Sequence, residues 1–384
     1  MTPNWKVIHA DALEGLRTLP SNSVQCCVTS PPYWNLRNYN AVGQIGLEKT
    51  DSEYLEALLK VFEEVKRVLR DDGLLFVNIG DTYVDKELCA IPWRFALLMR
   101  LNGWCLIRDI IWNKRRGMPE STKTRPTSIH EYIFMFAKQK DYFSDFINML
   151  EDALTEIGTK SGKGSAKRLI QQGVNARPEE YYVSNGKRMM RSVWSISTAN
   201  SFDGHFAVYP EEIVERCLRI ATTDKGCCAS CFAPIQREYV KVGGPPPRSE
   251  YVKTITKTSL PGYTSNDSCA LYGGDLSKMY NEYGYAEYKT VSWNRTCVKN
   301  CKSLECKICN GHGCESCVHT GIERIPNVVL DPFCGSGTTG VVALKMQRSF
   351  IGIELNGEYV ELSRRNICKD MSLFNTNAEV DNNG

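Results

Sequence analysis

The chain of 384 residues is too long for one small domain and, at roughly 150 residues per domain, predicts about two. Its 42% hydrophobic and 24% charged residues exclude global disorder, and its net charge of +3 excludes a histone-like polycation. No apolar run approaches the ~18 residues of a membrane span, and the first residues lack the pattern of a signal peptide. We therefore expect a cytoplasmic protein with no membrane partner, as a monomer or a dimer.

The N-terminal third alternates strand and helix patterns. Strands are predicted at residues 5–11, 24–30, 73–80, 105–112 and 131–137. Helices are predicted at 51–69, after a capping box of Thr50 and Glu53, and at 92–102, which Gly103 ends. Strands separated by helices indicate an α/β fold with a mostly parallel sheet and helices on both faces.

The middle of the chain has a different composition, and the strand and helix pattern returns after it. Residues 157–195 carry eight Lys or Arg against two Glu, whereas 261–290 are rich in Tyr, Gly, Ser and Asn. Helices are predicted again at 210–221, 338–346 and 358–367, and strands at 327–333 and 349–355. These changes divide the chain into residues 1–150, 151–200, 201–225, 226–325, 326–370 and a disordered tail at 371–384.

A glycine turn, Gly335-Ser-Gly337-Thr-Thr-Gly340, follows a predicted strand and begins a helix, and Glu354 ends the next strand 19 residues after Gly335. Glycines let the backbone approach a ligand, the helix N-terminus favours a negative group, and the acid can hold ribose hydroxyls. A tight turn without a ligand and an NAD oxidoreductase are the alternatives. The remaining strands of such a fold must come from the N-terminal third, which is the order of a circular permutation.

A second motif, Thr29-Ser30-Pro31-Pro32-Tyr33-Trp34, lies directly after a buried strand. The prolines fix φ and leave rigid carbonyl acceptors, Ser30 adds a hydroxyl, and Tyr33 and Trp34 add flat apolar faces. This set suits a planar base with an exocyclic amino group. The alternative is an ordinary loop stiffened by proline.

Together, TSPPYW and DPFCGSGTTG resemble the motifs of the DNA amino-methyltransferases, in the order of their permuted beta class. The resemblance covers residues 5–150, 192–222 and 326–368. It implies a circularly permuted Rossmann-like methyltransferase sheet and transfer of a methyl group from S-adenosylmethionine to a flipped-out base in double-stranded DNA. Ser30 is typical of the N(4)-cytosine enzymes, whereas the adenine enzymes usually carry Asp at this position.

The resemblance also implies roles for individual residues. Ser30 and the Pro31 carbonyl would accept hydrogen bonds from the target amino group, Pro32 would stiffen the turn, and Tyr33 would stack on the base. The segment 205–210 and its helix would close the methionine pocket. The implied cofactor-binding residues are Asp11, Asp331, Phe333, Cys334, Gly335, Ser336, Gly337, Thr338, Thr339 and Glu354. Cys334 lies in the cofactor turn and is not expected to be a nucleophile.

Ten of the 17 cysteines lie between Cys227 and Cys317. Their paired spacing favours structural zinc, and part of the stretch resembles the zinc repeat of DnaJ-type chaperones. The predicted ligands of two Zn²⁺ ions are Cys228, Cys231, Cys297 and Cys301 for one, and Cys306, Cys309, Cys314 and Cys317 for the other. An interleaved pairing, Cys227 in place of Cys228, and redox-active thiols are the alternatives.

Contacts to DNA are indicated by positive charge. The basic stretch within 151–200 is the candidate target-recognition region, where Arg188 and Arg191 could read guanine edges or simply be solvated. Residues 113–116 could contact phosphate, whereas His130 and Glu131 are interpreted as structural. A cognate restriction endonuclease is a candidate partner. The alternative functions are adenine methylation and a non-catalytic, zinc-containing DNA-binding protein.

Overall fold

A computed structural model describes the greater part of the chain. The described residues are 2–39, 41–115, 122–153, 160–161, 182–183, 186–198, 209–229, 231–242, 287–295 and 324–374. The chain divides into two compact units, the first of residues 1–148, 191–236 and 294–384, and the second of 149–190 and 237–293. The glycine turn and the Ser-Pro-Pro-Tyr turn both belong to the first unit.

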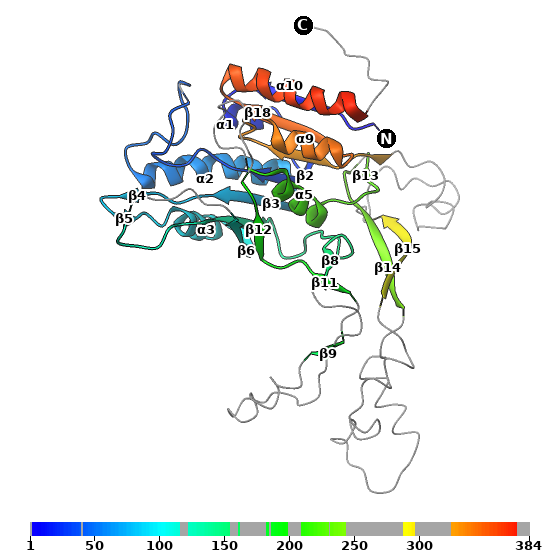
Figure 1. Cartoon of the computed structure of the whole chain (residues 1–384). Coiled ribbons are helices and arrows are strands. Elements are labelled where there is room, and N and C mark those ends of the chain that lie inside the picture. Colours follow the sequence, from blue (N-terminus) through cyan, green and yellow to red (C-terminus); the bar gives the residue numbers. More distant parts are fainter. Residues whose placement is uncertain are drawn as a thin grey trace. The chain divides into compact units, whose positions relative to one another are not determined.

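The first unit is built on an eight-stranded sheet (Figure 1). Its strands, in spatial order, are β1 (Trp5–His9), β18 (Ser349–Glu354), β17 (Val328–Asp331), β2 (Val24–Thr29), β3 (Leu69–Ile79), β7 (His130–Ala137), β6 (Cys105–Lys114) and β12 (Val193–Ile196). Neighbouring strands are parallel except β7, which is antiparallel to both β3 and β6. The predicted α/β fold with a mostly parallel sheet is therefore confirmed.

The two ends of the chain are interleaved in this sheet. Strands β17 and β18, which come last in the sequence, lie between β1 and β2, which come first. The register pairs Trp5 with Phe350 and His9 with Glu354, and the Ala10 N–H donates to the Glu354 carbonyl at 3.1 Å. The strands that carry the two sequence motifs, β2 and β17, are consequently direct neighbours.

Helices cover both faces of the sheet. On one face α1 (Ala12–Arg17), α2 (Asp51–Val68) and α3 (Ile91–Leu101) pack side by side, and on the other α5 (Glu211–Ala221), α9 (Thr338–Lys345) and α10 (Gly357–Phe374) do so (Figure 1). The side chains of β3 alternate between the two faces of the sheet. Leu75, Val77 and Ile79 belong to the core under α2, while Phe76 is buried on the opposite face. Burial on both faces explains why β3 reads as a continuous apolar run.

The predicted elements form where local chemistry favours them. The Thr50 hydroxyl accepts from the Glu53 N–H at 3.2 Å, and the Glu53 carboxylate accepts from the Thr50 N–H at 3.1 Å, which is the predicted capping box. Helix α10 continues to Phe374, so residues 371–374 of the predicted tail are helical. The rest of that tail lies outside the described residues.

Short strand pairs complete the described structure. They are β8 (Leu150–Asp152) with β11 (Lys187–Met189), β9 (Lys160–Ser161) with β10 (Tyr182–Val183), β14 (Ile235–Val242) with β15 (Glu287–Arg295), β13 (Cys227–Cys228) with β16 (Arg324–Ile325), and β4 (Tyr83–Val84) with β5 (Glu87–Leu88). Within the β8–β11 pair, Arg188 forms an ion pair with Glu151 at 2.9 Å, so this predicted guanine-reading side chain has an intramolecular partner. Arg191 is exposed.

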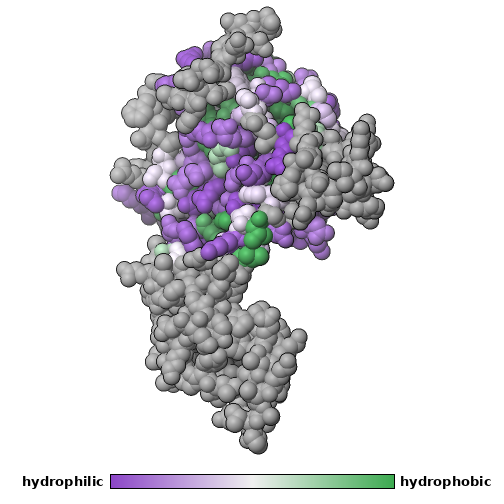
Figure 2. Space-filling view, turned by 90° about the vertical axis from the view of Figure 1, so that its right-hand side faces the viewer, coloured by the Kyte–Doolittle hydropathy of each residue, from purple (hydrophilic) through white to green (hydrophobic). Residues whose placement is uncertain are grey.

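No helix among the described residues combines the length and the apolar character needed to span a bilayer. Figure 2 shows a mainly hydrophilic surface on the face it presents, with hydrophobic residues in small groups between the grey segments.

Candidate active site

Two turns 302 residues apart in the sequence meet at one edge of the sheet. Thr29 ends β2 and Asp331 ends β17, and the Thr29 hydroxyl donates to Asp331 Oδ1 at 2.7 Å. Both strands are parallel, so the Ser30–Tyr33 turn and the glycine turn leave the sheet at its carboxyl edge. Ligands of open α/β sheets bind outside this edge, next to a topological switch.

Asp331 holds the glycine turn together. Its carboxylate also accepts from the Phe333 N–H at 3.1 Å, the Thr339 hydroxyl at 2.6 Å and the Tyr209 hydroxyl at 3.2 Å. Burial raises the pKa of Asp331, and these hydrogen bonds oppose that shift. A carboxylate has about four acceptor positions, and Thr29 takes the fourth. Asp331 and Thr339 therefore fix the conformation of the glycine turn.

Tyr209 closes over this cluster. It precedes helix α5, and its hydroxyl hydrogen-bonds to both Asp331 and Thr339. Burial raises the pKa of Tyr209, so the hydroxyl stays neutral. It belongs to the segment 205–210 predicted to close the methionine pocket, of which 205–208 lie outside the described residues.

The glycine turn has the backbone that its sequence requires. Gly335 has φ +53° and Gly337 has φ +86°, the left-handed region that favours glycine. Cys334, which directly precedes Gly335, is buried, and burial raises the pKa of its thiol well above the usual value, which keeps it neutral. A buried, neutral thiol is a weak nucleophile. The Ser336 carbonyl accepts from Asn366, while Phe333 and Thr338 are half-buried on the turn.

Glu354 links the turn to a pocket at the end of β18. One carboxylate oxygen accepts from the Gly335 N–H at 2.8 Å and the other from the Asn356 N–H at 2.9 Å. Burial raises the pKa of Glu354, and these backbone donors oppose the shift. An open pocket of about 480 Å³ adjoins it, lined by Tyr39, Ala41, Val42, Leu355, Asn356, Gly357 and Glu358.

Asp11 occupies a half-buried position at the start of α1. Its carboxylate caps this helix by accepting from the Leu13 N–H at 2.9 Å. The neighbouring His9 ring contacts the Leu355 carbonyl at 3.1 Å, which places this segment beside the residues that line the pocket. Glycine backbone, a carboxylate and a pocket beside it are together suited to an adenosine group.

The Ser-Pro-Pro-Tyr turn is anchored from α2. The Tyr54 hydroxyl donates to the Pro32 carbonyl at 2.8 Å. Trp34 was expected to offer a flat face to a ligand, but its side chain is 9% exposed in the core and its indole donates to the Glu48 carbonyl. Packing in the core buries the large apolar surface of this ring, and its N–H still has a hydrogen-bond partner. The aromatic side chain left at the edge is Tyr33, which is half-buried.

Sequence reasoning missed a polar network around Tyr33. The Tyr33 hydroxyl donates to the Glu131 carboxylate at 2.7 Å, and the Asn78 amide donates to the same hydroxyl and to Glu131 at 2.7 and 2.8 Å. Lys114 forms an ion pair with Glu131 at 2.5 Å. Glu131 was interpreted as structural and Lys114 as a candidate phosphate contact, because strand periodicity indicates burial but not partners.

The structure describes two of the eight predicted zinc ligands. They are Cys228 and Cys231, whereas Cys297, Cys301, Cys306, Cys309, Cys314 and Cys317 lie outside the described residues. Within the described ranges, no group of three or more His, Cys, Asp or Glu side chains could hold a metal ion. The two predicted sites each depend on cysteines beyond those ranges and stay predictions.

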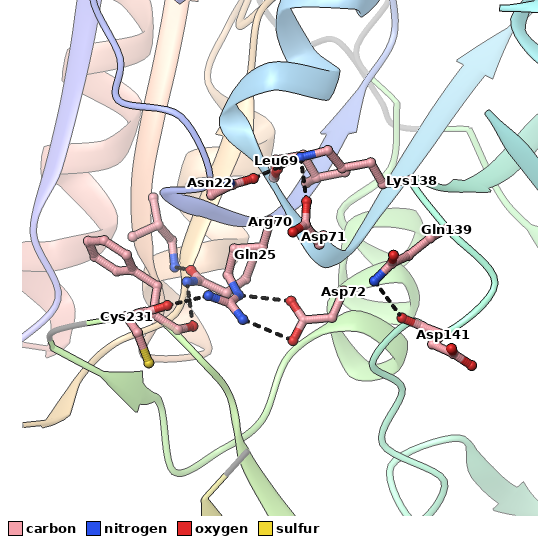
Figure 3. Close-up of polar contacts among 12 residues, drawn as sticks. Asn22, Gln25, Leu69, Arg70, Asp71, Asp72, Lys138, Gln139, Asp141 and Cys231 are labelled. Atoms are coloured by element: carbon pink, nitrogen blue, oxygen red, sulfur yellow. Dashed lines mark hydrogen bonds and ion pairs between the residues drawn. The ribbon is translucent and has the colours of Figure 1, made fainter. Parts of the chain in front are cut away.

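The loop that carries Cys228 and Cys231 is fastened to the edge of the sheet opposite the candidate active site. Arg70, the second residue of β3, donates to the Cys231 carbonyl and to Asp72 (Figure 3). Gln25, the second residue of β2, donates to the Phe232 carbonyl at 3.1 Å. Because β2 and β3 are parallel, both contacts lie at the edge where these strands begin.

The sheet, the glycine turn and the Ser-Pro-Pro-Tyr turn beside it define a methyltransferase-like nucleotide-binding fold. Residues 24–233 and 320–365 match the model of the N6/N4 DNA methylase family. The chain belongs to this family and is a DNA methyltransferase.

Its relatives include type II methyltransferases. M.XycI of Xanthomonas campestris pv. cyanopsidis is 35% identical over 299 residues, which cover 68% of this chain and 89% of that protein. M.SfiI of Streptomyces fimbriatus is 32% identical over 402 residues, covering 93% and 90%. The solved structure of the PvuII DNA methyltransferase (cytosine-N4-specific) has the same fold, with a TM-score of 0.52, 16% identity and coverage of 97% and 92%.

Proposed function

We propose that the protein transfers a methyl group from S-adenosylmethionine to the N4 amino group of a specific cytosine in double-stranded DNA. The observation that carries this proposal is the Thr29–Asp331 hydrogen bond, which brings the Ser-Pro-Pro-Tyr turn next to the glycine turn. Ser30 supports cytosine as the target, since it is the residue typical of the cytosine enzymes. The circular permutation expected for the beta class is supported by the place of β17 and β18 between β1 and β2.

The residues at the glycine turn fit the cofactor. Gly335 and Gly337 let the backbone approach it, and the Glu354 carboxylate would accept hydrogen bonds from the ribose hydroxyls. The pocket beside Leu355 and Asn356, with Asp11 nearby, would hold the adenine ring. The bound cofactor supplies a methyl group that is already activated by its positively charged sulfur.

The Ser-Pro-Pro-Tyr turn would hold the target base. Its amino group lies inside the duplex, so the base must first be flipped out. The Ser30 hydroxyl and the Pro31 carbonyl would accept from the amino group and orient its lone pair, while the Tyr33 ring stacks on the base. The buried, neutral thiol of Cys334 takes no part.

The remaining parts of the chain would bind DNA and metal. The basic residues within 151–200 provide affinity for phosphate. Two structural Zn²⁺ ions, each held by four thiolates, would stabilise the insertion at 226–325, with its first cysteines fixed to the sheet by Arg70 and Gln25. A restriction endonuclease of the same site specificity would be the functional partner of such a methyltransferase.

Mass spectrometry of nucleosides tests the proposal. The chain is expressed in a host free of DNA methylation, beside a variant with Ser30→Ala and Tyr33→Ala. N(4)-methylcytosine in the wild-type sample alone supports the proposal, and sequencing then locates the site. N(6)-methyladenine would show that adenine is the target, and the absence of both would favour the non-catalytic DNA-binding protein.

A further inference from the structure

Asn78 carries an unused buried hydrogen-bond acceptor beside the candidate active site. It lies at the end of β3 with 4% of its surface exposed. Among the residues that the structure describes, its side-chain oxygen Oδ1 has no hydrogen-bond partner. A buried acceptor without a donor destabilises the folded protein, so its presence here points to a ligand that brings the donor.

The orientation of this amide is fixed by charge. Its nitrogen donates to the Tyr33 hydroxyl and to the Glu131 carboxylate, at 2.7 and 2.8 Å. If the amide turned over, its oxygen would face the carboxylate and the two acceptors would repel each other. Lys114 pairs with the other oxygen of Glu131 at 2.5 Å and so holds the carboxylate in place. The network therefore keeps the nitrogen of Asn78 inward and leaves Oδ1 available.

The same network places Asn78 next to the Ser-Pro-Pro-Tyr turn. In the parallel pair of β2 and β3, Thr29 is in register with Val77, so Ser30 and Asn78 follow side by side. The Asn78 side chain also donates to the hydroxyl of Tyr33, the last residue of that turn. Asn78 thus adjoins the turn proposed to hold the target base.

We propose that Asn78 Oδ1 accepts one N–H of the target base's exocyclic amino group, and that Glu131 and Lys114 are positioning residues that orient it. This inference rests on the proposed function. An amino group has two N–H donors, so Asn78 Oδ1 would accept from one while the Ser30 hydroxyl and the Pro31 carbonyl share the other. A base with a carbonyl oxygen at that place, such as thymine, would set two acceptors against each other. Asn78 would therefore help to restrict the reaction to amino-bearing bases.

A binding experiment isolates this contact. The probe is a DNA duplex with the methylation site located by sequencing, and a second duplex in which the target base lacks its amino group. The analogue is 2-pyrimidinone for cytosine or purine for adenine. Dissociation constants are measured with S-adenosylhomocysteine, which has no methyl group to transfer. The proteins are the wild type, Asn78→Ala, the double variant Asn78→Asp with Glu131→Gln, and the surface control Asn102→Ala. The side-chain amide of Asn102 donates to the Leu98 carbonyl of its own helix.

The wild type and Asn102→Ala should bind the amino-bearing duplex more tightly than the analogue. Asn78→Ala should reduce this preference about tenfold, the effect of one hydrogen bond. Asn78→Asp combined with Glu131→Gln exchanges the carboxylate and the amide, so the inward hydrogen bond is kept, Oδ1 remains an acceptor and the preference should be retained. An unchanged preference in Asn78→Ala would overturn the inference. If Asn78→Ala binds neither duplex, the double variant Asn78→Asp with Glu131→Gln decides, because loss of the preference there contradicts the role of the acceptor.

Methylation by the wild type separates this inference from the proposed function. With S-adenosylmethionine, methylation of the amino-bearing duplex by the wild type supports the proposed function whatever the variants do. If the wild type does not methylate this duplex, the proposed function fails and the role of Asn78 fails with it.

Discussion

Gly337→Ala should destabilise the first unit by about 2–5 kcal/mol, as the sum of two separate costs. The residue has φ +86°, and an L-residue in the left-handed region costs roughly 1–2 kcal/mol. The added Cβ would also lie 2.9 Å from Ser363 Cβ, 3.1 Å from its Cα and 3.2 Å from its carbonyl oxygen. Ser363 is fully buried in α10, and overpacking a buried contact costs about 1–3 kcal/mol.

Gly335→Ala is the matched control for this prediction. It lies in the same turn with φ +53°, but the nearest atom to its added Cβ is the Phe333 oxygen at 4.0 Å. The control therefore carries the backbone cost without the overlap, and the two variants should differ by about 1–3 kcal/mol.

Urea unfolding followed by tryptophan fluorescence measures the difference. The buried tryptophans Trp34, Trp104, Trp112 and Trp194 all belong to the first unit and report on it. The midpoint should shift much further for Gly337→Ala than for Gly335→Ala, with an unchanged slope. Equal midpoints in the two variants would refute the reasoning that Gly337 packs too closely against Ser363 of α10 for a Cβ to fit.

Three more predictions concern the Asp331 carboxylate, the Glu354 carboxylate and the predicted zinc sites. Thr29→Val removes a donor from the buried Asp331 carboxylate and should cost about 1–3 kcal/mol in urea unfolding, whereas Thr29→Ser should cost less; equal losses would show that the hydrogen bond is not responsible. Burial raises the pKa of Glu354, and ribose hydroxyls bind its ionised form. The affinity for S-adenosylmethionine should therefore fall as the pH drops through that raised pKa, and the affinity of Glu354→Gln should not depend on pH in this way. Equilibrium dialysis measures both, and the same pH dependence in the wild type and in Glu354→Gln would contradict the prediction. Metal analysis should find about two zinc ions per chain and about one in Cys306→Ser, and well under one in the wild type would refute the zinc prediction.

Several features of this protein were determined by short stretches of sequence. The capping box of Thr50 and Glu53 formed as predicted, because its partners are three residues apart. The turns at Pro31 and Gly335 were located because proline and glycine act on their own backbone. The same two motifs identified the family, since each carries its chemistry within a few residues.

Other features were decided by the tertiary structure alone. Hydrophobic periodicity shows that a strand is buried but not its direction, so the antiparallel β7 could not be predicted. Trp34 was expected at the site because a motif shows that an aromatic side chain is present but not where it points, and in the structure Trp34 packs in the core. The network of Tyr33, Asn78, Lys114 and Glu131 joins four segments of the sheet and its edge. Which donor meets which acceptor depends on strand order and register, and these are set by the packing of the whole sheet.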